Sequence, residues 1–218
     1  GWEALLHDPD YRRAHGETKY FFAIYEYQGR VDGYVVYRIS HNREYRNSNS
    51  TLVIRELISA TNEAEERLWR YCLDIDLIAR VEVHNRPMHD PLYWRLADPR
   101  RLIRRPIDAV WVRIVDLPSA MEARKYMLEG TLVFEVQDQF CDWNTGVWEL
   151  DTMTPEAVCR RSDRAPTIRL GAEELGAVFL GGVKPSTLAG SGRVEELAYG
   201  ALDQADRTFG TTLAPWSP

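Results

Sequence analysis

Two apolar runs joined by a glycine-bearing turn place the strongest constraint on the fold of this chain. The run YFFAIYEY (20–27) is followed by QGRVDG (28–33) and then by YVVYRIS (34–40). Aromatic and β-branched residues on both sides of a short turn are typical of a β-hairpin. A third run, TLVIRELI (51–58), follows a polar stretch, so the sequence predicts an antiparallel meander.

Helical patterns are interspersed with these strands. In NEAEERLWRYCLDID (62–76), apolar residues recur at helical spacing and Asn62 and Glu65 are placed as a capping pair. We expect a short strand at 79–84 and, in the second half, strands at 108–116, 131–138, 147–151, 157–161 and 167–170 and helices at 117–126, 172–180 and 193–209. Because strands and helices mix without regular βαβ alternation, the fold class predicted for the chain is α+β.

A proline- and arginine-rich stretch, DPLYWRLADPRRLIRRP (90–106), divides the sequence. We place a domain boundary near its end, giving domains 1–104 and 105–218. Its five arginines could form a phosphate-binding patch, but they lack interleaved aromatic residues and the chain around them is acidic. A solvated or interdomain face is therefore the favoured interpretation.

Composition and charge exclude several classes of function. A formal net charge of -6 disfavours a nucleic-acid-binding protein, which usually carries a basic stripe. The sequence has no apolar run of membrane-spanning length and no signal-peptide pattern at its start, so we expect a cytoplasmic protein without membrane contact. Three widely spaced cysteines and five scattered histidines predict neither a disulfide framework nor a metal site.

The common catalytic motifs are also missing from the sequence. It contains no G-x-S-x-G, Walker, H-E-x-x-H or G-x-G-x-x-G pattern. The phrase RRAHGE (12–17) has the arginine and glycine of an acetyl-CoA pyrophosphate loop, but Glu17 stands where a small residue is needed and would repel phosphate. No catalytic or cofactor-binding residue is therefore assigned in this chain.

Four phrases in order give the chain a family resemblance: ELISATNEAEERLWRYCLDID, DPLYWRLADPR, DAVWVRIVDLPSAMEARKY and LGGVKPSTLA. They resemble the C-terminal portion of the Eis-type (enhanced intracellular survival) GNAT N-acetyltransferases. The resemblance implies three successive domains in the complete protein: a GNAT domain that binds acetyl-CoA, a second GNAT-like domain without that site, and a sterol-carrier-protein-like domain. We expect this chain to begin inside the second domain, so that the cofactor domain lies outside it.

The resemblance also implies an activity and a substrate-binding site. The family transfers acetyl groups to amines of polycationic acceptors, including aminoglycosides and lysine side chains, and tends to form hexamers. By motif alignment, Trp2, Asp8 and Asp108 correspond to acceptor-pocket residues, and the family's general base, a C-terminal carboxylate, is expected to be absent here. The chain alone should then be inactive, contributing acceptor pocket and oligomer contacts.

Two other interpretations remain open. In the first, the sterol-carrier-like half is a stand-alone binding module in which Trp111, Phe134 and Trp148 enclose a cavity for an apolar ligand. The simpler explanation of these aromatic residues is core packing. In the second, the chain is a purely structural oligomerisation segment.

Overall fold

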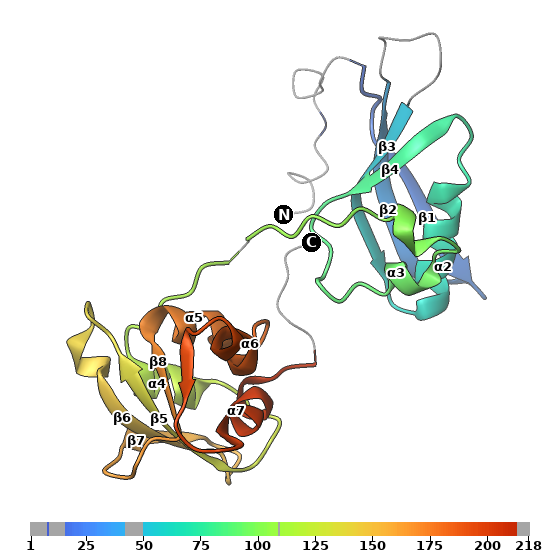
Figure 1. Cartoon of the computed structure of the whole chain (residues 1–218). Coiled ribbons are helices and arrows are strands. Elements are labelled where there is room, and N and C mark those ends of the chain that lie inside the picture. Colours follow the sequence, from blue (N-terminus) through green and yellow to red (C-terminus); the bar gives the residue numbers. More distant parts are fainter. Residues whose placement is uncertain (1–7, 9–15, 42–49, 109, 213–218) are drawn as a thin grey trace. The chain divides into compact units, whose positions relative to one another are not determined.

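A computed structural model of the chain describes residue 8 and residues 16–41, 50–108 and 110–212 (Figure 1). These residues form two compact units, one ending at Arg104 and one starting at Arg105. No helix in the described part of the chain is long and apolar enough to cross a membrane. Each unit is described separately below.

The first unit contains a four-stranded sheet in the order β1-β2-β3-β4. Its strands are β1 (Phe21–Tyr27), β2 (Arg30–Ser40), β3 (Ser50–Ser59) and β4 (Ile78–Val83). The predicted meander is confirmed, because β1, β2 and β3 pair antiparallel. The last strand, β4, joins β3 in parallel, which the sequence pattern did not indicate.

Helix α2 (Asn62–Leu73) connects β3 to β4 and covers one face of this sheet. The hydroxyl of Thr61 accepts a hydrogen bond from the N–H of Ala64 at 3.1 Å and so caps the helix, one residue before the predicted Asn62. The buried residues of α2 and the strands form the core on this side: Val35, Tyr37, Leu52, Ile54, Leu57, Leu68, Trp69 and Cys72.

The segment after β4 is tied to α2 by one arginine. Arg86 donates to Glu65 at 2.8 Å, to Asp90 at 2.5 Å and to the carbonyl of Leu57 at 3.0 Å. These bonds precede two short helices, α3 (Leu92–Arg95) and η2 (Pro99–Arg101). Charge-assisted bonds of this kind orient a segment that has no sheet to pair with.

The second unit contains a five-stranded sheet in the order β7-β6-β5-β8-β9. Its strands are β5 (Thr131–Gln137), β6 (Gly146–Asp151), β7 (Val158–Arg161), β8 (Ile168–Gly171) and β9 (Val194–Glu196). The helices are α4 (Leu117–Ala123), η3 (Asp142–Asn144), α5 (Ala172–Phe179), α6 (Pro185–Gly190) and α7 (Ala201–Phe209). One sheet face packs with α4, α5 and α7 around the fully buried Phe134, Leu150 and Ile168.

The opposite face of this second sheet carries a ladder of charges. Arg160 on β7 pairs with Glu149 on β6 at 2.6 Å. Further across the same face, Arg169 on β8 bridges Glu135 on β5 at 2.9 Å and Glu195 on β9 at 2.5 Å. A sheet with one apolar and one charged face is typical of a two-layer α+β domain. The predicted fold class is therefore confirmed.

Two predicted elements of the second unit were wrong. The single helix expected over 193–209 is split into strand β9 and helix α7. Gly200, in the left-handed region with φ of 82°, lies between them and interrupts the helical backbone. The strand expected over 108–116 is not formed, because residues 110–115 pair with no strand among the described residues.

Candidate functional site

The first sequence-predicted site residue, Asp8, lies beside the start of β1. Its carboxylate accepts a hydrogen bond from the backbone N–H of Tyr20 at 3.2 Å. Next to it, the guanidinium of Arg38 lies 4.2 Å from the centre of the Tyr20 ring and pairs with Glu17 at 2.6 Å. Asp8 is half-buried, so its carboxylate is oriented by the sheet while part of it remains accessible to a cation.

The other two predicted residues do not form a site with Asp8 inside one unit. Asp108 belongs to the second unit, where it is exposed and part of no helix or strand. Trp2 lies outside the described residues. The grouping of Trp2, Asp8 and Asp108 in one acceptor pocket therefore stays a prediction.

The junction between β3 and α2 is where a strand leads into a helix N-terminus, the arrangement that binds pyrophosphate in nucleotide-type cofactors. Here the N–H of Ala64 already donates a hydrogen bond to the Thr61 hydroxyl. The first turn of α2 carries two carboxylates, Glu63 and Glu65, of which Glu65 is held by Arg86 and Arg95 at 2.8 and 3.1 Å. Carboxylates favour this positive helix end but repel a phosphate placed there, so the junction does not fit acetyl-CoA.

Two of the three cysteines, Cys72 and Cys159, lack the properties of nucleophiles. Burial raises the pKa of Cys72 to about 12, and burial together with the nearby Glu122 raises the pKa of Cys159 to about 12. Both thiols therefore stay protonated at neutral pH and react slowly. Within the described residues, no group of three His, Cys, Asp or Glu side chains is placed to hold a metal ion.

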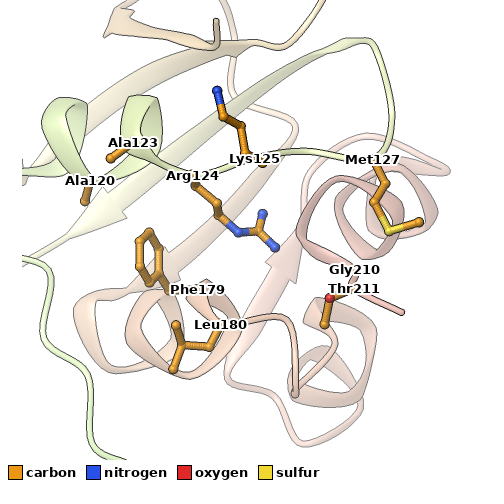
Figure 2. A pocket seen from close by; sticks show the side chains of 9 residues that line it. All are labelled: Ala120, Ala123, Arg124, Lys125, Met127, Phe179, Leu180, Gly210 and Thr211. Atoms are coloured by element: carbon orange, nitrogen blue, oxygen red, sulfur yellow. The ribbon is translucent and has the colours of Figure 1, made fainter. Parts of the chain in front are cut away.

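A concave pocket of about 440 Å³ lies in the second unit, near the C-terminal ends of α4, α5 and α7 (Figure 2). Arg124 extends into it between Phe179 and Thr211, whereas the Lys125 side chain points away. The guanidinium of Arg124 donates to the carbonyls of Thr208 and Phe209 at 3.1 and 2.6 Å, and so caps the end of α7. The lining is otherwise mostly apolar: Ala120, Ala123, Met127, Phe179 and Leu180, with Gly210 and Thr211.

The aromatic cavity predicted for this unit is not formed by the residues proposed for it. Phe134 is fully buried and Trp148 is 5% exposed, and both belong to the continuous core. Trp111 is 84% exposed on the surface. The sequence prediction missed the pocket near Arg124 because its walls come from three segments far apart in the chain, and none of them carries a recognisable motif.

Comparison with known proteins assigns a family to each half of the chain. Residues 1–114 match the family described as an acetyltransferase (GNAT) domain. Residues 117–218 match the family described as a sterol carrier protein domain. The order of the two domains is the one that the sequence resemblance implied.

Individual relatives carry related names. The chain is 36% identical to an uncharacterized N-acetyltransferase of Streptomyces coelicolor, over 100% of this chain and 53% of the relative. It is 30% identical to N-acetyltransferase Eis of Mycobacterium tuberculosis, over 97% of this chain and 49% of the relative. The crystal structure of Eis1 from Mycobacterium abscessus matches with a TM-score of 0.67 and 31% identity, over 84% of this chain and 46% of that one. The chain thus spans about half the length of the curated relatives it matches.

Proposed function

The chain belongs to the GNAT acetyltransferase family, and from this premise we propose that it is the acceptor-binding part of an Eis-like N-acetyltransferase. In that role it contributes residues that hold a polycationic amine, and acetyl-CoA binds to a domain outside it. The acceptors would be aminoglycosides or lysine side chains, whose amines take up the acetyl group. The observation that carries this proposal is the acidic first turn of α2, because its carboxylates repel phosphate at the β3–α2 junction, where a strand leads into a helix N-terminus as in a pyrophosphate site.

The acceptor pocket is proposed to use Trp2, Asp8 and Asp108. A polycationic amine needs carboxylates that attract it and orient one amine toward the acyl donor. Asp8 is suited to this task because its carboxylate is already oriented by the N–H of Tyr20. Asp108 is exposed and in a connecting segment, so its carboxylate is accessible to a charged ligand.

The first test measures acetyl transfer with the protein made from its native gene. An aminoglycoside or a lysine-containing peptide is the acceptor, and release of the CoA thiol is followed. We expect Asp108→Asn to raise the KM for the aminoglycoside several-fold with little change in kcat, because a carboxylate that attracts the acceptor acts mainly on binding. Asp163→Asn, at another exposed position of the second unit, removes the same charge and should change neither constant.

Two outcomes would overturn this proposal. Unchanged KM and kcat for several aminoglycosides in Asp108→Asn would remove Asp108 from the pocket. Saturable binding of acetyl-CoA to the 218-residue chain by itself, measured by calorimetry, would contradict the placement of the cofactor outside it. We also propose that the complete protein is a homo-oligomer, a hexamer if it follows the family, and the mass of the native protein in solution tests this.

A second candidate function rests on the pocket near Arg124, whose apolar walls and volume of about 440 Å³ suit a small apolar ligand. In this case the second half of the chain is a binding module for a lipid or hydrophobic metabolite. Binding of a fluorescent fatty acid should be lost in Ala123→Trp, which fills the pocket, and kept in Ala165→Trp, an exposed site elsewhere in the unit. Equal uptake by both variants, or none by the unmodified protein, would exclude this function for the pocket.

A further inference from the structure

The free edges of the two sheets are not protected in the same way. In the described residues, three of the four edge strands are short or charged: β7 ends in Arg160 and Arg161, β9 has three residues including Glu195 and Glu196, and β4 carries Arg80 and Glu82. Such features keep an edge from pairing with other chains. Strand β1, with seven residues and one charge, has no such protection.

Strand β1 also exposes large apolar side chains. Phe22 and Ile24 are 60% and 61% exposed on the face opposite α2. Phe21, on the α2 side, stacks on Tyr37 at a centroid distance of 5.4 Å and is still 45% exposed. A long apolar strand at the edge of a sheet, with large side chains exposed on its open face, is typical of a strand that pairs with another polypeptide.

The charges near β1 indicate which partner strand fits. Lys19, just before the strand, and Glu26, near its end, are the only charged residues between positions 19 and 27. Both are exposed, and neither forms an ion pair among the described residues. An identical strand running antiparallel would set each Lys19 end beside a Glu26 end. A parallel copy would set like charges together, which is destabilising.

We propose that β1 pairs antiparallel with β1 of a second copy of this chain, which continues the four-stranded sheet across a two-fold contact. Near the centre of the strand, aromatic and β-branched residues such as Phe22 and Ile24 then lie beside one another, the kind of cross-strand pair that stabilises a sheet. A two-fold contact of one surface with itself is the commonest in homo-oligomers and fits any even number of subunits. This inference rests on the homo-oligomer of the proposed function and names one of its surfaces.

The test measures the mass of the native protein by light scattering or sedimentation. Ile24→Lys places a charge at the centre of the strand. It should halve the mass of a dimer, and in a larger assembly it should remove the contacts made across two-fold axes and so lower the mass. Leu77→Lys is the matched control, because Leu77 is 76% exposed in the turn before β4 and away from β1. Thermal melting of each variant checks that its fold is retained.

A charge exchange tests the antiparallel direction. Lys19→Glu and Glu26→Lys, made singly, each set like charges together at both ends of the contact and should weaken the dimer. The double variant restores opposite charges and should recover the unmodified dissociation constant. Recovery in the double variant depends on the pairing geometry and not on the stability of the single chain.

The outcomes separate this inference from the proposal on which it rests. A native protein that is monomeric at all concentrations contradicts both the oligomer and the contact. An oligomer whose mass is unchanged by Ile24→Lys keeps the oligomer and overturns the β1 contact. Loss of thermal stability in a monomeric Ile24→Lys variant would show that a segment of the same chain covers the strand, which also overturns the contact.

Discussion

The outward faces of the two sheets differ in chemistry. In the second unit, the face opposite the helices is a ladder of ion pairs centred on Glu149 and Arg169. In the first unit, the corresponding face presents Phe22 and Ile24 at its β1 edge. Each sheet has its own apolar core on its helix-covered side, so the difference between the outward faces does not come from the need for a core.

A charged ladder is what a sheet carries when its outer face stays in water, whereas exposed aromatic residues at an edge are costly unless something covers them. The comparison therefore indicates that the second sheet faces solvent and that the first has a contact surface. The five predictions below test this difference, and they are ordered by the size of the expected effect.

The largest expected effect is the difference in unfolding free energy between replacing a phenylalanine of the core and replacing one at the sheet edge. Phe134→Ala, in the second core, should lower the free energy of unfolding by about 3–5 kcal/mol, because a buried ring is replaced by a cavity. Phe22→Ala should change the stability of the isolated subunit by less than about 0.5 kcal/mol. Urea denaturation at a concentration where the protein is monomeric measures both. A large loss in monomeric Phe22→Ala would place that face inside the subunit's own core.

The next effect concerns a carboxylate that is buried just after the end of β5. Asp138, 5% exposed, accepts hydrogen bonds from the N–H groups of Phe140 and Cys141 at 3.0 and 2.8 Å and pairs with Arg113 at 2.5 Å. Asp138→Ala leaves the two N–H groups without their acceptor and should cost about 1–3 kcal/mol, measured by the same denaturation. A negligible cost would mean that this loop is not part of the cooperative structure.

The same carboxylate predicts a dependence on pH. Burial by itself would raise the pKa of Asp138, but the N–H groups of Cys141 and Phe140, with help from Asn144 and Arg113, hold it below its usual value. A group whose pKa is lowered by folding stabilises the fold above its unfolded pKa, near 3.9 for aspartate. This contribution should be lost as the pH falls further, and Asp138→Ala should flatten that part of the stability profile.

Local periodicity predicted the fold class, the hairpin and most strands because each depends on neighbouring residues. It failed at 193–209, where Val194, Leu197 and Ala201 satisfy a helical spacing although β9 ends at Glu196 and α7 begins only after its N-cap, Gly200. It also failed at Trp111, because the residue type alone does not show whether an aromatic side chain is buried in a core or exposed on the surface. The hydrogen bonds of Arg86 to Glu65 and to the Leu57 carbonyl join segments far apart in sequence and therefore leave no local pattern.

The candidate site was less accessible to sequence reasoning than the fold. Trp2, Asp8 and Asp108 came from family resemblance, since isolated carboxylates give no spacing by which to recognise a pocket. The misfit of the α2 N-terminus to pyrophosphate could be read in part from the sequence, because Glu63 and Glu65 follow Thr61 directly. What the sequence could not supply was the partnership of Glu65 with Arg86 and Arg95, which keeps that carboxylate in place.

A smaller effect is expected on the labelling rates of the buried thiols, one in each unit. Thr61→Ala removes the cap of α2 and should cost about 1 kcal/mol, which converts to about a fivefold increase in local opening. Labelling of Cys72, on α2, by a thiol reagent at pH 8 should then accelerate about fivefold, while Cys159 in the second unit keeps its rate. Peptide mass spectrometry resolves the two sites. Equal acceleration at both would show that the units open together and would remove the basis for comparing them separately.

The smallest effect is expected on the ladder itself. Arg169→Gln breaks the bridges to Glu135 and Glu195, but these side chains are 37%, 25% and 57% exposed, so solvent already screens their attraction. The denaturation midpoint should shift less than it does in Thr61→Ala, and the shift should vanish at about 0.5 M salt because the screening length falls to a few ångströms. A shift as large as that of Asp138→Ala, or one that resists salt, would mean that the ladder is shielded from water. The second sheet would then also have a covered outer face, and the exposed apolar edge of β1 would no longer distinguish the two units.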